Sequence, residues 1–172
     1  MSLRLIQQVE TERRSIVDIG GGASFLVDRL IEDGYHDVTV VDIAAAALAH
    51  GMARLDQQAT WIVADATTWK PGRTFALWHD RAVFHFLTSS KDRAAYVATA
   101  SRSVEAGGHI VLGTFALDGP TMCSGLTVHQ YDAGGLTAEF APGFRLVTQT
   151  TDEHLTPSGG IQRFTFVVLQ RL

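Results

Sequence analysis

The fold is decided by a short stretch near the amino terminus, SIVDIGGGAS at residues 15–24. Residues 15–19 form an apolar run that is too short for a core helix and therefore predicts a buried strand. Glycines occupy 20–22, and apolar residues then recur at helical spacing over 25–31. A strand that enters a glycine loop and then a helix is typical of a ligand-binding turn, because glycine permits close backbone approach and the helix start offers free N–H groups.

Working outward from this stretch, short β-branched runs alternate with Ala-rich, helix-spaced segments, which predicts βαβ units. Further strands are expected at 37–43, 60–64, 75–79, 109–115, 144–150 and 162–169. The connection 67–74 is too short for a crossover helix, and the last two strands alternate around a turn at 156–160. The sequence therefore predicts an α/β, Rossmann-like three-layer sandwich with a mostly parallel seven-stranded sheet and a carboxyl-terminal antiparallel hairpin at about 144–170.

Composition and length narrow the class of protein. A chain of 172 residues with 46% apolar and 19% charged residues is globular and fits one domain over 1–172, with a short amino-terminal helix. A net charge of −4 argues against a nucleic-acid partner, and no apolar stretch is long enough to span a membrane. One cysteine, Cys123, and no His-x-x-x-His pair predict neither a disulfide nor a metal site. We expect a cytoplasmic protein; the sequence leaves its oligomeric state open.

The glycine loop does not fit a nicotinamide dinucleotide. In the pattern G-x-G-x-x-G, Gly20 and Gly22 match but Phe25 stands at the last position, where a bulky ring opposes close helix–strand packing. Asp42, at the end of the second strand, is placed to accept hydrogen bonds from both ribose hydroxyls of a nucleoside, or to cap the following helix. Asp65 follows the third strand in the same way, with a turn or cap as its alternative role.

The stretch 17–24 resembles the first motif of class I S-adenosylmethionine-dependent methyltransferases, with Ser24 in place of the third loop glycine. Residues 40–43, 64–66 and 105–109 are similar to further motifs of that family. The resemblance implies S-adenosylmethionine as the cofactor, with the ribose on Asp42 and the adenine amino group on Asp65. The cofactor-binding residues expected are Asp18, Gly20, Gly21, Gly22, Ser24, Asp42, Ile43, Asp65, Ala66 and His79.

Groups that could act on an acceptor gather at the end of the fourth strand. We expect Asp80 and His85 to be catalytic, with His85 as a base, and Arg81 could hold an acceptor carboxylate. The alternatives are an Asp80–Arg81 ion pair and a core histidine. Residues 64–71 are also similar to trans-aconitate methyltransferases. These features predict methyl transfer to a small molecule; a protein-side-chain methyltransferase and a non-catalytic nucleoside-binding module are the alternatives.

Overall fold

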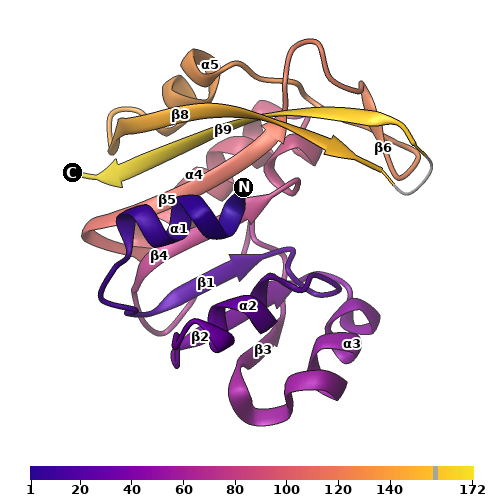
Figure 1. Cartoon of the computed structure of the whole chain (residues 1–172). Coiled ribbons are helices and arrows are strands. Elements are labelled where there is room, and N and C mark those ends of the chain that lie inside the picture. Colours follow the sequence, from indigo (N-terminus) through magenta and orange to yellow (C-terminus); the bar gives the residue numbers. More distant parts are fainter. Residues whose placement is uncertain (157–158) are drawn as a thin grey trace.

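The computed structural model of the protein describes residues 1–156 and 159–172 (Figure 1). Its helices are α1 (Ser2–Val9), α2 (Leu26–Glu32), α3 (Ala45–Leu55), α4 (Ser90–Ser103) and α5 (Ala133–Phe140), with short 3₁₀ helices at Asp56–Gln58 and Phe84–Phe86. Its strands are β1 (Ile16–Ile19), β2 (Val38–Asp42), β3 (Thr60–Val63), β4 (Phe75–Arg81), β5 (Val104–Phe115), β6 (Met122–Cys123), β7 (Leu126–Thr127), β8 (Phe144–Leu155) and β9 (Ile161–Arg171). No helix among these residues is long and apolar enough to cross a membrane.

The described strands build a seven-stranded sheet in the order β3-β2-β1-β4-β5-β9-β8, and β6 pairs with β7 in a separate two-stranded sheet. The first five strands of the large sheet pair in parallel, whereas β9 is antiparallel to both β5 and β8. The predicted mostly parallel sheet with a terminal antiparallel hairpin is therefore confirmed. Pro157 and Ser158 of the predicted hairpin turn lie outside the described residues.

Helices cover both faces of the sheet (Figure 1). Apolar residues of α1, α2 and α3 pack with one set of strand side chains, whose buried members include Ile16, Val40 and Leu77. Residues of α4 and α5 pack with the alternate set, among them Val17 and Trp78. Because successive strand residues point to opposite faces, nearly continuous apolar strands bury both sides, which produces the predicted three layers.

Three local features differ from the sequence-based expectation. Helix α3 runs beyond the Ala-rich segment to Leu55, and Gly51 lets the Trp61 ring lie against it. Strand β5 begins at Val104 rather than at 109, through an irregular segment in which Gly107 has φ +78°. The β6–β7 pair was not predicted, since strands of two residues carry no alternation to detect.

Candidate functional site

The glycine loop after β1 is shaped so that side chains would not fit. Gly20 has φ +71°, and a Cβ there would collide with the side chain of Val83. A Cβ on Gly22 would stand 2.8 Å from Oδ2 of Asp42. Of the three loop glycines, Gly20 is exposed at the carboxyl end of β1, whereas Gly21 and Gly22 are buried.

Asp42 closes β2 and holds the neighbouring loops. Its Oδ2 accepts a hydrogen bond from the Gly22 amide at 3.2 Å, and its Oδ1 accepts one from the Ala44 amide at 2.8 Å. The predicted alternative, an N-cap for the following helix, is wrong, because Ala44 is the N-cap residue of α3 and no side chain caps it; Asp42 binds loop amides instead. Each carboxylate oxygen can accept more than one hydrogen bond, so the side chain keeps capacity for a pair of hydroxyls.

Asp65 stands in the same relation to β3. Its Oδ1 accepts hydrogen bonds from the amide and the hydroxyl of Thr67, at 2.8 and 2.7 Å. No hydrogen bond to its Oδ2 is present in the described part of the chain, and the side chain is exposed. A ligand amino group can therefore reach that oxygen without breaking an existing contact.

These ends meet around a cavity of about 600 Å³ at the carboxyl edge of the sheet. Of the predicted cofactor residues, those in its wall are Gly20, Asp42, Ile43, Asp65 and Ala66. The residues that sequence reasoning missed include Thr67, Val83, Phe86, Leu87 and Leu126. Leu126 comes from the unpredicted β6–β7 pair, whose only signal in the sequence is the turn-forming dipeptide Ser124-Gly125.

Asp18 and His79 lie beneath this wall. Asp18 is 2% exposed and its Oδ1 is 2.6 Å from Nδ1 of His79, whose Nε2 is 2.9 Å from the Ser2 hydroxyl. Oδ2 of Asp18 is buried with no hydrogen-bond partner among the described residues, and a Cβ on Gly21 would run into it. An orphaned carboxylate oxygen under a glycine loop fits a ligand that carries an ammonium group, because burying such an oxygen without a donor is costly.

Ser24 has a local role in the structure. Its hydroxyl accepts a hydrogen bond from the Leu26 amide at 3.0 Å and so satisfies one free N–H at the start of α2. The other predicted cofactor residues, Asp18, Gly21, Gly22, Ser24 and His79, do not line the cavity.

Asp80 is fully buried and both of its oxygens are occupied. Oδ1 accepts a hydrogen bond from the Val83 amide at 2.8 Å, and Oδ2 accepts bonds from the Phe84 amide at 3.0 Å and the Tyr96 hydroxyl at 2.5 Å. Burial raises the pKa of Asp80 to about 6, against the lowering effect of those donors. Through the Val83 and Phe84 amides, its side chain fixes the loop after β4, in which Ala82 has φ +71°. Residues of that loop line the cavity.

His85 lies in the same loop, packed between aromatic rings. Its ring centroid is 4.5 Å from that of Phe86 and 4.7 Å from that of Phe115. Both ring nitrogens are buried and lack a hydrogen-bond partner among the described residues. Burial lowers the pKa of His85 to about 4, so the imidazole is neutral near pH 7. The position of His85 fits the predicted alternative, a histidine in the core, but its ring nitrogens make no hydrogen bond in the described residues.

Arg81 ends β4 at the mouth of the cavity. It is exposed, lines the cavity, and has its guanidinium carbon 4.9 Å from the centre of the Phe164 ring. The described residues contain no ion pair between Arg81 and Asp80, since that carboxylate points into the core. They also contain no cluster of three metal-ligating side chains.

The strand order, the glycine loop and the carboxylates at successive strand ends match a known family. The profile of a methyltransferase domain family matches residues 16–108, more than half of the chain. The chain belongs to this family, which confirms the predicted class I S-adenosylmethionine-dependent methyltransferase resemblance. None of the curated protein sequences compared with the chain matches it significantly.

Solved structures share the fold at low sequence identity. An S-adenosylmethionine-dependent methyltransferase from Methanosarcina mazei has a TM-score of 0.79 at 19% identity, covering 98% of this chain and 97% of its own. The N-methyltransferase NodS from Bradyrhizobium japonicum WM9 has a TM-score of 0.77 at 15% identity, covering 99% and 93%. A 1,6-didemethyltoxoflavin-N1-methyltransferase from Burkholderia thailandensis, solved with 1,6-didemethyltoxoflavin and S-adenosylhomocysteine, has a TM-score of 0.79 at 15% identity, covering 99% and 76%. The finer similarity to trans-aconitate methyltransferases stays a prediction.

Proposed function

We propose that this methyltransferase transfers the methyl group of S-adenosylmethionine to a small-molecule acceptor in the cavity at the carboxyl edge of the sheet. One observation carries the proposal. A single cavity of about 600 Å³ joins Gly20, Asp42 and Asp65 at one end to Phe86 and other apolar residues at the other. That volume lies within the range of cavities that bind small organic molecules, and the apolar residues in the same wall offer an acceptor a surface next to the cofactor-binding acids.

The residues present fit the cofactor. Asp42 would accept hydrogen bonds from the ribose hydroxyls and Asp65 one from the adenine amino group, since both keep free acceptor capacity. The backbone of the glycine loop and the orphaned Oδ2 of Asp18 would face the methionine end, whose ammonium group supplies the missing donor. When bound, the cofactor supplies a methyl group already activated on a sulfonium sulfur.

The main task left to the chain is alignment of the acceptor with that methyl group. Asp80 serves it indirectly by holding the Val83 and Phe84 amides, and with them the loop that forms the cavity wall. His85 is the candidate base because its ring nitrogens make no hydrogen bond in the described residues, but its burial and its pKa of about 4 make it a weak one. Neither side chain lines the cavity, which favours alignment over proton transfer as the larger contribution.

Two measurements test the proposal. Titration calorimetry with S-adenosylhomocysteine asks whether the cofactor site exists, and methyl-labelled S-adenosylmethionine incubated with a cell lysate asks where the label goes. We expect binding, and label in the low-mass fraction. Label confined to protein would contradict the small-molecule acceptor and support a protein-side-chain methyltransferase. Binding without any transfer would support a nucleoside-binding module, and absence of binding would overturn the whole assignment.

A further inference from the structure

Arg81 differs from every other arginine in the described residues. Each of the others donates at least one hydrogen bond to a protein atom, as Arg93 does to Glu139 and Arg73 to Asp37. Arg81 makes no hydrogen bond or ion pair within the described chain, and its contact is with the Phe164 ring. Stacking engages the flat face of the guanidinium and leaves its N–H edges free for a ligand.

The position of Arg81 gives this difference a meaning. It is the one positively charged side chain among the described residues that line the cavity. Three acidic side chains, Asp42, Asp65 and Asp92, line the same wall, but none of them forms an ion pair with Arg81. The guanidinium of Arg81 therefore keeps its N–H groups free for a ligand.

The surface beside Arg81 is apolar. Val83, Phe86, Leu87 and Leu126 line that side of the cavity, and Leu126 is 60% exposed. The cofactor-binding acids Asp42 and Asp65 follow β2 and β3, on the far side of β1 from β4. A ligand that fills the rest of the cavity thus meets these apolar side chains, one guanidinium fork, and Asp92 and Tyr96 of α4.

We propose that the methyl acceptor carries a carboxylate, which binds the guanidinium of Arg81 through paired hydrogen bonds while an apolar body lies against Phe86 and Leu126. This inference rests on the proposed function and names its substrate class. A single planar guanidinium with two N–H groups in parallel matches a carboxylate, whereas a phosphate dianion is usually met by several cations or a nest of amides. Arg81 then sets specificity and orients the acceptor toward the cofactor.

The cofactor also has a carboxylate, so the experiment must separate the two ligands. A metabolite extract is divided by ion exchange into anionic, neutral and cationic pools, and each pool is incubated with methyl-labelled S-adenosylmethionine. Wild type is compared with Arg81→Gln, with Arg81→Lys, and with Arg29→Gln, which removes the same charge from an exposed pair on α2. The affinity of each variant for S-adenosylhomocysteine is measured by calorimetry, and labelled products are identified by mass spectrometry.

We expect label in the anionic pool, on a compound with a carboxyl group. Arg81→Gln should raise the KM for that pool about tenfold or more while the affinity for S-adenosylhomocysteine stays within about twofold. Arg81→Lys should recover part of the loss, because it keeps the charge but not the fork, and Arg29→Gln should behave as wild type.

Label only in the neutral or cationic pool, or on an acceptor whose only anionic group is a phosphate, would overturn the inference and leave the proposed function standing. An unchanged KM in Arg81→Gln would overturn it as well. Loss of S-adenosylhomocysteine affinity in that variant would assign Arg81 to the cofactor instead. Absence of transfer from every pool would contradict the proposed function and this inference together.

Discussion

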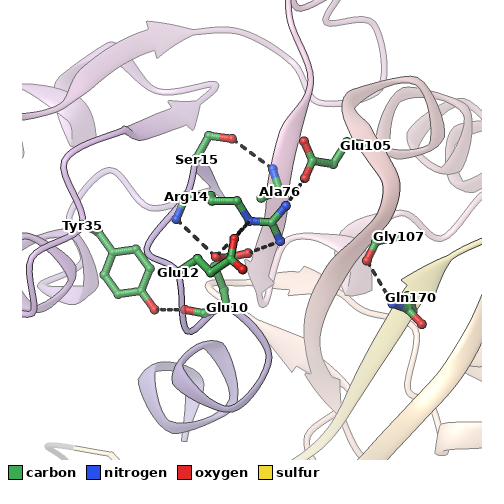
Figure 2. Close-up of polar contacts among 9 residues, drawn as sticks. All are labelled: Glu10, Glu12, Arg14, Ser15, Tyr35, Ala76, Glu105, Gly107 and Gln170. Atoms are coloured by element: carbon green, nitrogen blue, oxygen red, sulfur yellow. Dashed lines mark hydrogen bonds and ion pairs between the residues drawn. The ribbon is translucent and has the colours of Figure 1, made fainter.

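The two ends of the parallel sheet differ in whether their charged side chains are paired with other residues of the protein. At the amino ends, Arg14 donates hydrogen bonds to Glu10 and Glu105, while the Ser15 hydroxyl accepts one from the Ala76 amide (Figure 2). Figure 2 also shows the Gly107 carbonyl accepting a hydrogen bond from Gln170. At the carboxyl ends, the described residues supply no hydrogen-bond partner to the guanidinium of Arg81 or to Oδ2 of Asp65.

This contrast separates charged groups that stabilise the fold from charged groups that are available to bind a ligand. The amino end also has a depression of about 300 Å³, yet the polar groups there are used internally. Gln7 donates to Asp33 at 2.5 Å, and the Tyr35 hydroxyl donates to the Glu10 carbonyl at 2.7 Å. A hollow whose polar groups are satisfied gives a ligand little to bind, which supports the carboxyl end as the proposed site.

The largest effect is expected from Arg14→Ala. Glu10 is 1% exposed, and removing Arg14 leaves this buried carboxylate without its cation. Breaking a fully buried ion pair costs more, but Arg14 is half exposed, so we expect a loss of about 2–3 kcal/mol in the free energy of unfolding. Arg81→Ala, from the opposite end, should cost less than about 1 kcal/mol since only a ring contact is lost. Urea denaturation measures both. Equal losses would remove the distinction between the two ends.

Asp42→Ala should act on the ligand. Loss of the ribose hydrogen bonds should weaken S-adenosylhomocysteine binding by about 1–3 kcal/mol, roughly 5- to 150-fold. A 2′-deoxy analogue should then bind this variant about as well as the parent compound. The matched control is Asp37→Ala, just before the same strand, where the carboxylate pairs with Arg73. Calorimetry should show wild-type affinity in the control; equal weakening in both variants would point to general destabilisation.

The pH dependence of stability should reveal His85. Its pKa of about 4 in the folded state lies below the ordinary 6.5, so the unfolded state binds more protons between these values and stability falls as pH falls through that window. When the pH falls from 6.5 to 5, the free energy of unfolding of His85→Phe should therefore decrease by about 1–2 kcal/mol less than that of the wild type. Asp80, whose pKa is raised to about 6, contributes with the opposite sign in both proteins and cancels in the difference.

Urea denaturation at several pH values measures this difference, with His50→Phe on the exposed surface of α3 as the control. We expect the control to follow the wild-type pH dependence. Parallel curves for wild type and His85→Phe would mean that folding does not shift the pKa of His85, which would contradict its burial as a neutral imidazole.

The smallest effect is expected from Asp65→Ala, because Asp65 is exposed and its Oδ1 is already shared with Thr67. We expect a loss of about 1 kcal/mol in affinity for S-adenosylhomocysteine. The more telling change is selective: the variant should no longer distinguish adenine from hypoxanthine in the cofactor base, while its sensitivity to the ribose hydroxyls persists. Competition binding with the two base analogues measures this, and retained discrimination would exclude Asp65 as the adenine partner.

The mostly parallel sheet and the residues at its strand ends could be predicted from the sequence. Asp42 and Asp65 could be placed at the cavity because the carboxyl ends of parallel strands meet at one edge, whatever the details of packing. The pairing of Asp18 with His79 could not, because it depends on the register that sets these two residues side by side in β1 and β4.

Other parts of the site arise from contacts between distant segments. Leu126 reaches the cavity from a two-residue strand whose position no local pattern encodes. The burial of Asp80 depends on Tyr96 of α4, and the lack of an acidic partner for Arg81 follows from that burial. The sequence therefore predicted which residue types stand near the site, and tertiary packing decides which of them remain free for a ligand.

Hydrogen–deuterium exchange with and without S-adenosylhomocysteine tests the central claim most directly, since it reports where the ligand binds. The account predicts slower exchange over residues 20–24, 42–44 and 64–67 at the carboxyl ends, and unchanged exchange over residues 10–15 and 104–108 at the amino ends. Protection at the amino ends, or no protection at either end under saturating ligand, would contradict it.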